Sequence, residues 1–318
     1  MGKAQVAVVI PAYKVSKHIL DVISGIGPEI THIFVVDDAC PEGSGKLVQA
    51  NCRDKRVAVL FHEQNQGVGG AVTSGYKAAL AAGAEIVVKV DGDGQMDPHE
   101  IPNLIRPIIQ GRADYAKGNR FDSIEDLEGM PLIRVLGNAA LSLISKISTG
   151  YWNITDPTNG FTAIHRFVLN KIDLDRLRKN YFFESDMLFR LSTIRAVVFD
   201  VSIPAKYGDE ESNLKISRVL VEFPWRYLVN FLKRIFYRYY LREWTVASIE
   251  LPVGCLMIVF GIGYGISKLI YSSTTGVPTS AGTVMISVLP IIVGFQLALA
   301  FINYDVSNIP NRPRQLES

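Results

Sequence analysis

Cysteine is scarce in this 318-residue chain, which contains only Cys40, Cys52 and Cys255. The three residues are not spaced like the ligands of a metal site, and their odd number argues against a framework of disulfides. Such sparse usage suits a reducing compartment. The formal net charge is also small, at +2 from 33 basic and 31 acidic residues, so no nucleic-acid partner is expected. A disulfide-rich secreted domain and a cysteine-based metal protein are therefore disfavoured.

The glycine motifs that commonly hold phosphate are missing too. No GxxxxGK(S/T) loop occurs, and the stretch GVGG at 67–70 lacks the third glycine of a dinucleotide-binding fingerprint. An EF-hand is excluded by position, because counting from Asp91 puts Met96 where glycine is required and Pro102 where a bidentate glutamate is required. Any diphosphate that this chain binds must therefore be held in another way, by a metal ion or by arginines.

Apolar residues are abundant and unevenly placed. They make up 48% of the chain, mean hydropathy is +0.19, and they concentrate in the runs 251–271 and 284–304. Each run is long enough to cross a hydrocarbon core of about 30 Å as a helix, although a pair of buried core helices is the alternative. Residues 215–242 carry many basic residues and the loop after the first run carries no charge. The positive-inside rule then predicts a hairpin with both ends in the cytoplasm.

Residues 225–242 are predicted to form an amphipathic helix on the membrane surface, although a basic helix can also bind a partner protein. The expected solvent face carries Arg226, Asn230, Lys233, Arg234 and Arg238. The expected membrane face carries Trp225, Leu228, Val229, Phe231, Leu232, Ile235, Phe236, Tyr239 and Tyr240.

The first 110 residues alternate between strand and helix patterns. Strands are predicted at 5–11, 32–38, 57–62 and 85–91, each followed by a helix, at 16–26, 45–52, 68–82 and 98–110. After residue 113 the pattern is mixed, with strands at 113–120, 160–166 and 196–207 and helices at 132–148 and 185–194. This order predicts an α/β, Rossmann-like domain with a mostly parallel sheet, and ligands in such sheets bind at the carboxyl ends of the strands.

Oxygen-bearing side chains follow the predicted strand 85–91. Asp91, Asp93 and Gln95 lie within the segment DGDGQ, and hard oxygen ligands of this kind suit Mg²⁺ or Mn²⁺ bound together with a diphosphate. An Asp-Gly turn without a function is the alternative. Glu184 and Asp186 could form a second acidic pair, although Ser185 and Asp186 are also typical of an ordinary helix start, which is the interpretation we favour.

Six segments in order resemble the motifs of one family. They are IPAY at 10–13, VVDDACPEGSG at 35–45, NQGVGGAVTSGY at 65–76, VDGDGQMDP at 90–98, GNR at 118–120 and DPTNGFTA at 156–163. Together they resemble the polyisoprenyl-phosphate glycosyltransferases, the dolichol-phosphate mannose synthase-like branch of the family 2 glycosyltransferases. The two-span tail is similar to that of bacterial bactoprenol glucosyltransferases. The resemblance implies a nucleotide-diphospho-sugar transferase (GT-A) fold.

The resemblance also implies roles for individual residues. The nucleotide sugar would be bound by Pro11, Tyr13, Asp38, Asp91 and Arg120, and the metal by Asp91, Asp93 and Gln95. Asp156 and Asp93 would be catalytic, and Arg134, Lys215 and Arg218 would bind the acceptor phosphate. The chain departs from the family where Lys14-Val15 replaces the usual Asn-Glu, and where Cys40-Pro-Glu-Gly replaces the usual Ser-Pro-Asp-Gly.

The expected reaction is inverting transfer of one sugar from a nucleotide-diphospho-sugar to a polyprenyl phosphate, with UDP-glucose favoured as donor and GDP-mannose second. The expected organisation is a cytoplasmic transferase domain at 1–214, a basic juxtamembrane segment at 215–244 and a hairpin with a short tail at 245–318, in a plasma (bacterial inner) membrane. A homo-oligomer is compatible with this organisation. The alternatives are a processive polysaccharide synthase, whose QxxRW motif is missing, and a non-catalytic membrane scaffold.

Overall fold

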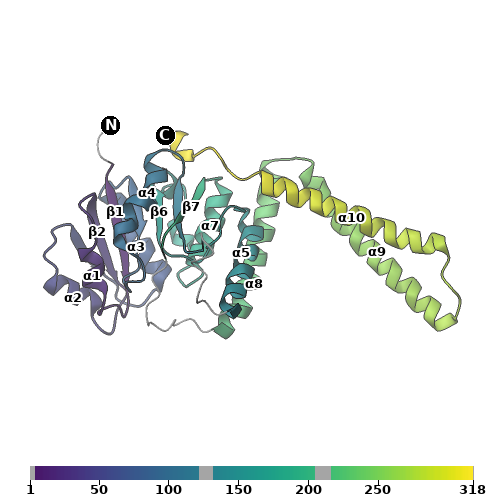
Figure 1. Ribbon diagram of the computed structural model, residues 1–318, viewed down its shortest axis with the longest axis horizontal. Helices are drawn as coiled ribbons and strands as arrows, with labels where there is room; N and C mark the ends of the chain where they lie inside the picture. Colours follow the sequence, from purple (N-terminus) through teal and green to yellow (C-terminus); the bar gives the residue numbers. More distant parts are fainter. Residues whose placement is uncertain (1–3, 122–131, 205–215, 318) are drawn as a thin grey trace. The chain divides into compact units, whose positions relative to one another are not determined.

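The computed structural model describes residues 4–121, 132–204 and 216–317 (Figure 1). The chain forms two compact units, one comprising Met1–Phe231 together with Pro310–Ser318 and the other Leu232–Ile309. The sequence analysis grouped the C-terminal segment with the hairpin, whereas the structure packs it in the first unit. We describe each unit by itself.

The first unit is built on a seven-stranded sheet with the order β3-β2-β1-β4-β6-β5-β7 (Figure 1). Its strands are β1 (Val6–Ala12), β2 (Ile30–Asp37), β3 (Val57–Phe61), β4 (Ile86–Lys89), β5 (Tyr115–Asn119), β6 (Thr162–His165) and β7 (Val198–Ser202). All neighbouring pairs are parallel except β4 with β6 and β5 with β6. The predicted α/β class and mostly parallel sheet are confirmed.

Helices cover both faces of this sheet. Consecutive side chains of a strand point to opposite faces, and because they are apolar on both, each face must be buried. Val9 and Val87 belong to a core that includes residues of α3 and α7, whereas Val8 and Val88 belong to one that includes residues of α1 and α4. The helices of this unit are α1 (Ile19–Ser24), α2 (Ser44–Asn51), α3 (Val68–Ala81), α4 (Ile101–Ile109), α5 (Leu132–Thr149), α6 (Arg166–Leu169) and α7 (Phe183–Thr193), with short 3₁₀ turns at η1 (Pro98–Glu100), η3 (Leu174–Arg176) and η5 (Arg314–Glu317).

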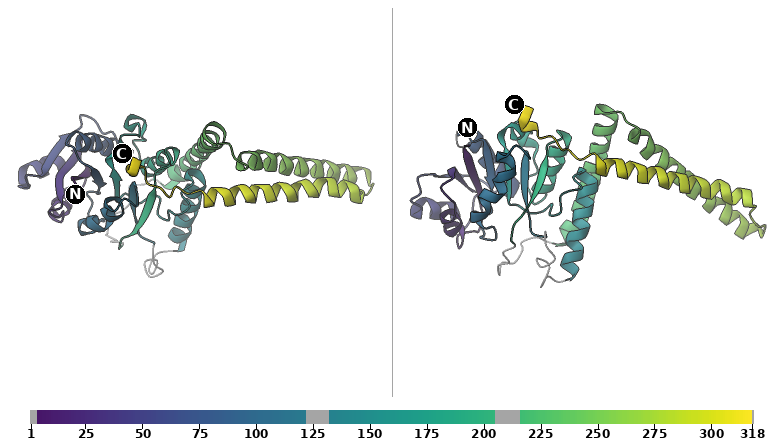
Figure 2. Two further views of the ribbon diagram at one scale, coloured as in Figure 1. Left: turned by 90° about the horizontal axis from the view of Figure 1, so that it is seen from above. Right: turned by 45° about the horizontal axis from the view of Figure 1, so that its top comes forward.

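The second unit consists mainly of two long helices that run side by side (Figure 2). These are α9 (Ala247–Thr275) and α10 (Ala281–Ser307), and by length and composition both could cross a membrane. Glycines allow the two backbones to approach closely. A Cβ on Gly254 would lie 2.8 Å from the carbonyl oxygen of Gly294, and Ser287 Oγ donates to the carbonyl of Gly261 at 2.8 Å. Such small-residue contacts are typical of helix pairs in lipid.

Helix α8 (Ile216–Phe236) continues as the π-helical turn η4 (Tyr237–Arg242), so it begins nine residues before the predicted helix and includes Pro224. The predicted division of its faces is partly wrong. Arg234 is 2% exposed and forms two hydrogen bonds with Asp305 of α10, at 2.7 and 3.1 Å. Tyr239, expected on the membrane face, is 1% exposed and donates to the same carboxylate at 2.6 Å. The physical reason is Asp305, a buried acid that must be paired.

Candidate functional site

The acidic loop after β4 lies at the carboxyl edge of the sheet. The Asp91 carboxylate is partly exposed, and its Oδ1 lies 2.8 Å from Nζ of the buried Lys89. Asp93 Oδ1 accepts a hydrogen bond from the backbone N–H of Gln95 at 3.0 Å, and Gly94 between them has a φ of +80°. The structure thus brings Asp91, Asp93 and Gln95 together in one tight turn.

The chemistry of this turn fits a divalent metal that shares its ligands with a diphosphate. Within the described residues, no group of three or more histidine, cysteine or acidic side chains converges as a metal centre. Two carboxylates two residues apart supply hard oxygen donors but leave most of the coordination of Mg²⁺ or Mn²⁺ to phosphate and water. A resident structural metal would need more protein ligands than this turn offers.

Lys89 ties this turn to two other segments. Its Nζ lies 3.1 Å from Oε1 of Glu184 in α7 and 3.2 Å from the carbonyl oxygen of Gly160. Burial lowers the pKa of Lys89, but the carboxylates of Asp91 and Glu184 outweigh burial and raise it. Gly160 is required here, since a Cβ would lie 2.4 Å from Nζ of Lys89 and 2.6 Å from Oδ2 of Asp91.

A second ion pair lies at the ends of β5 and the loop before β6. Asp156 is fully buried and accepts hydrogen bonds from Arg120 Nε at 2.7 Å and Nη2 at 3.2 Å. Thr158 Oγ1 donates to the same carboxylate at 3.3 Å. This bidentate pairing holds Asp156 rigidly while the Arg120 side chain stays 33% exposed, so its guanidinium can still meet a ligand.

Two further titratable groups are buried beside this pair. Lys117 of β5 is fully buried and donates to the carbonyl of Asn159. Burial lowers its pKa to about 8, although Glu184 and Asp156 oppose this. Asp200 of β7 is opposite Lys117 in the sheet register, and burial raises its pKa to about 6.

The residues expected to contact the nucleotide lie at the ends of β1 and β2. Tyr13 is 43% exposed and Pro11 is partly buried. Asp38 is 2% exposed, and its oxygens accept from the backbone N–H groups of Gln66 at 2.8 Å and Gly67 at 2.7 Å. Its role in this structure is therefore to hold the start of α3, which brings the 65–70 segment to the same edge.

The predicted acceptor-binding residues cannot be placed relative to this edge. Lys215 lies outside the described residues. Arg134 and Arg218 belong to α5 and α8, but their side chains lie outside the described part of the chain. Asp186, considered as part of a second acidic pair, accepts from the backbone N–H of Arg178 and from Arg190 Nε, so it serves the start of α7.

The sequence analysis missed Lys89, Lys117 and the contact of Glu184. The favoured helix start at Ser185 is two residues late, because α7 begins at Phe183. A usable signal was present, since both lysines interrupt apolar strands at inward-facing positions. A charged residue at such a position must have a partner inside the protein.

Comparison with known proteins shows the family to which this chain belongs. The profile of glycosyl transferase family 2 matches residues 7–173, which is more than half of the chain. The chain belongs to glycosyl transferase family 2. The expected family is thereby confirmed, and this family 2 enzyme is a glycosyltransferase.

Relatives of this glycosyltransferase include enzymes named for lipid acceptors. The UDP-N-acetylglucosamine–dolichyl-phosphate N-acetylglucosaminyltransferase of Methanococcus voltae is 30% identical over 73% of this chain and 98% of its own length. The undecaprenyl-phosphate mannosyltransferase of Micrococcus luteus is 33% identical over 54% of this chain and 70% of its own length. The polyprenol monophosphomannose synthase of Mycolicibacterium smegmatis is 31% identical over 64% and 77%.

Solved structures share the fold of this glycosyltransferase. Glucosyl-3-phosphoglycerate synthase from Mycobacterium tuberculosis, in complex with Mn²⁺, UDP and glucosyl-3-phosphoglycerate, aligns with a TM-score of 0.53 and 18% identity. The alignment covers 73% of this chain and 80% of that one. The expected GT-A fold is confirmed by this likeness.

Proposed function

We propose that this glycosyltransferase transfers one sugar, with inversion, from a nucleotide-diphospho-sugar to a membrane polyprenyl phosphate. The observation that carries the proposal is that the Asp91–Asp93 turn and the Arg120–Asp156 pair lie at the same carboxyl edge of the sheet, where Lys89 links Asp91 to the loop that contains Asp156 and Gly160. The lipid acceptors named for the relatives from Methanococcus and Micrococcus support the choice of acceptor.

Asp91 and Asp93 would hold Mg²⁺ or Mn²⁺, with Gln95 beside them. A bound metal supplies neutralisation of the charge that develops on the leaving nucleoside diphosphate. The Mn²⁺ and Mg²⁺ complexes of the structural neighbours support this assignment. Tyr13 and Pro11 would line the nucleotide pocket, and Asp38 would shape it through the backbone at Gln66 and Gly67.

Asp156 and Arg120 would act at the reacting centre. A phosphate monoester is already largely ionised at neutral pH, because its second pKa is about 6, so it needs little help from a general base. Asp156, fixed by Arg120, would position the sugar or the acceptor, and the exposed part of the Arg120 guanidinium would bind phosphate. Arg134, Lys215 and Arg218 are proposed to bind the acceptor phosphate.

Two exposed apolar surfaces support a membrane location for the acceptor. Within the first unit, Leu132, Ile133 and Leu136 of α5 and Trp225 and Leu228 of α8 are all exposed. Large exposed apolar patches mark interaction sites, and a bilayer would cover these side chains. Helices α9 and α10 would then cross that bilayer as a hairpin.

We further propose that the catalytic domain and both ends of the hairpin are cytoplasmic. The chain leaves the first unit before α9 and returns to it after α10 at Pro310–Ser318, which supports an even number of crossings. A cysteine at Thr279, in a chain lacking Cys40, Cys52 and Cys255, should react with an impermeant thiol reagent applied to intact cells. A cysteine at Ser16 is the matched control, and its labelling instead would reverse the orientation.

A donor panel tests the reaction. The purified full chain in detergent should be given radiolabelled UDP-glucose, GDP-mannose or UDP-N-acetylglucosamine with undecaprenyl or dolichyl phosphate, with Mn²⁺ or with excess EDTA. We expect metal-dependent label in the lipid phase from one donor, with UDP-glucose the first candidate and GDP-mannose the second. A long polymer would indicate a processive synthase. No release of nucleotide from any donor would indicate a scaffold.

A further inference from the structure

Lys89 and Lys117 occupy equivalent places on the two sides of β6. In the sheet register both residues pair with Thr162, Lys89 from β4 and Lys117 from β5. Residues opposite each other in neighbouring strands point to the same face of a sheet. The two lysines are therefore carried side by side on rigid strands, and both are fully buried.

The two ammonium groups reach one loop. Lys117 donates to the carbonyl of Asn159, and Lys89 Nζ lies 3.2 Å from the carbonyl oxygen of Gly160. These adjacent carbonyls end the loop that begins at Asp156 and leads into β6. Lys89 also contacts Asp91 at 2.8 Å and Glu184 at 3.1 Å. The lysine pair thus connects the loop of Asp156 to the turn of Asp91.

Core packing alone does not account for these residues. Buried ion pairs are often no more stabilising than apolar side chains of similar volume, because desolvation offsets the attraction between the charges. Val87 and Val88 beside Lys89 show that β4 accommodates apolar residues in the core. A lysine at these two positions can form hydrogen bonds that a valine cannot. These bonds fix the loop of Asp156 relative to the turn of Asp91.

We propose that Lys89 and Lys117 are positioning residues that hold Asp156 and the Asp91–Asp93 turn in the arrangement that binds a metal–diphosphate. The inference rests on the proposed function. Lys89 restrains Asp91 directly, whereas Lys117 acts only through the backbone of the loop. Loss of Lys89 should therefore have the larger effect on metal-dependent binding.

The test measures binding rather than turnover. Isothermal titration of the detergent-solubilised full chain with UDP, and separately with GDP, should be done with and without Mn²⁺. The ratio of the two dissociation constants is the gain from the metal. We expect Lys89→Met to reduce this gain by about tenfold and Lys117→Met by about threefold, with metal-free affinity changed by less than about twofold.

Two further variants separate positioning from folding. Lys77→Met removes a lysine–carboxylate pair of the same chemistry, with Asp175, on the exposed surface of α3, and it should leave the metal gain unchanged. Lys89→Met combined with Glu184→Gln avoids leaving Glu184 buried without its cation. It should unfold at a higher temperature than Lys89→Met alone and show the same reduced metal gain.

The outcomes separate the two claims. If the wild-type chain shows no metal gain with either nucleotide, both the proposed function and the lysine proposal are contradicted. If the wild-type chain shows the gain and the folded Lys89 variants keep it, only the positioning role is overturned. If neither Lys89 variant folds, the lysine is needed for the core itself and the proposal is likewise overturned.

Discussion

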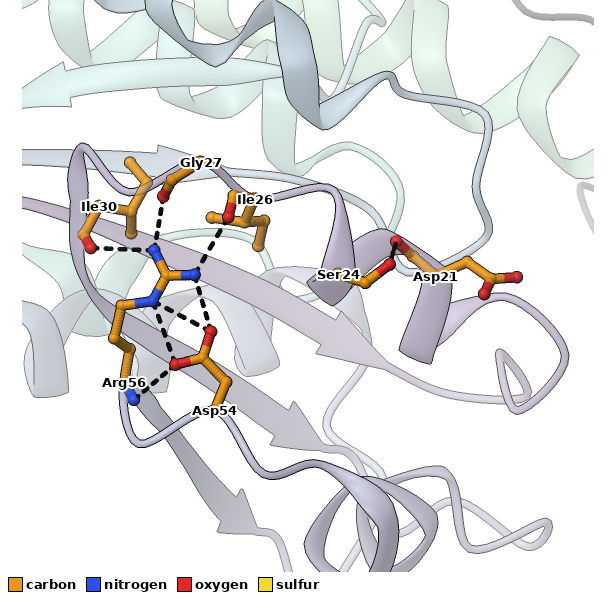
Figure 3. A network of polar contacts seen from close by, with 7 residues as sticks. All are labelled: Asp21, Ser24, Ile26, Gly27, Ile30, Asp54 and Arg56. Carbon is orange, nitrogen blue, oxygen red and sulfur yellow. Dashed lines mark hydrogen bonds and ion pairs between the residues drawn. The ribbon is translucent and has the colours of Figure 1, made fainter.

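The two edges of the central sheet both carry charged side chains that are paired within the protein, but the partners differ. At the amino edge, Arg56, just before β3, donates to the backbone carbonyls of Ile26 at 3.0 Å, Ile30 at 3.2 Å and Gly27 (Figure 3). Its remaining contacts go to Asp54, whose pKa is lowered by these hydrogen bonds. The Arg56 guanidinium is thus bound by backbone carbonyls of residues 26–30 and by the carboxylate of Asp54.

Asp114, just before β5, shows the same pattern at that edge. Its fully buried carboxylate accepts from the backbone N–H groups of Val197 at 2.8 Å, Arg314 at 2.9 Å and Gln315 at 2.8 Å. The last two contacts fasten the C-terminal segment to the first unit. A charge satisfied by three backbone donors has a structural role.

At the carboxyl edge, backbone N–H groups hold Asp38, but the two ion pairs proposed to meet a ligand join charged side chains to each other. Asp91 pairs with Lys89, and Asp156 pairs with Arg120. Asp91 and Arg120 remain partly exposed, at 27% and 33% of their side-chain surface. Side chains can exchange partners at lower cost than backbone groups in a sheet, so this edge can accept a charged ligand. The comparison indicates that the kind of partner, more than burial, separates the charges proposed to bind a ligand from those with a structural role.

The largest effect is expected at the carboxyl edge, from Asp93→Asn. The substitution removes a carboxylate charge that is proposed to bind the metal from a partly exposed turn. Transfer should therefore fall by at least about 100-fold, or roughly 3 kcal/mol of barrier, with the melting temperature unchanged. Radiolabel transfer to polyprenyl phosphate measures the loss. Asp175→Asn, at an exposed ion pair, is the control and should keep full activity. Undiminished transfer by the folded Asp93→Asn chain, or by wild type in excess chelator, would contradict the metal role.

The second effect is expected at the amino edge, from Asp114→Asn. An amide has one oxygen for three N–H donors and turns its own NH₂ toward the others, which leaves buried donors unsatisfied. We expect the free energy of unfolding to fall by about 2–4 kcal/mol, measured by denaturant titration in detergent. Nucleotide affinity in the presence of Mn²⁺ should change by less than about twofold. Weakened binding at unchanged stability would mean that the two edges are not separate in function.

The sheet and its carboxyl edge were predictable because their signals are local. An apolar run such as Val6–Ala12 is typical of a strand that is buried on both faces of a sheet, so it predicts a strand without knowledge of its neighbours. The turn at Asp91 follows such a run directly, so the sequence places its carboxylates at the strand end. Tight turns with Asp and Gly depend on neighbouring residues alone.

The remaining features depend on partners far along the chain. Lys89 is explained by Glu184, and Arg234 by Asp305, and neither partner can be found from a periodic pattern. For Asp38 the resemblance implied a nucleotide contact, which stays a prediction, whereas the hydrogen bonds that its oxygens accept from the backbone at Gln66 and Gly67 could not be read from the sequence. Sequence reasoning locates a charged residue in an element and does not identify the groups that satisfy it.

The smallest effect sharpens the comparison between two buried carboxylates, Asp114 and Asp200. Asp200 accepts a hydrogen bond from the backbone N–H of Thr155 at 2.7 Å, and burial raises its pKa from 3.8 to about 6. The folded state therefore holds the proton more tightly than the unfolded state, so the stability due to the protonated form is lost as the pH rises from 3.8 through 6. Asp200→Asn imitates the protonated form and keeps an oxygen for Thr155. It should stabilise the protein by on the order of 1–2 kcal/mol at pH 7.5 and by much less at pH 4, measured by thermal unfolding in detergent. An equal gain at both pH values would show that ionisation of Asp200 carries no cost, and a loss of stability at pH 7.5 would mean that Asp200 resembles Asp114.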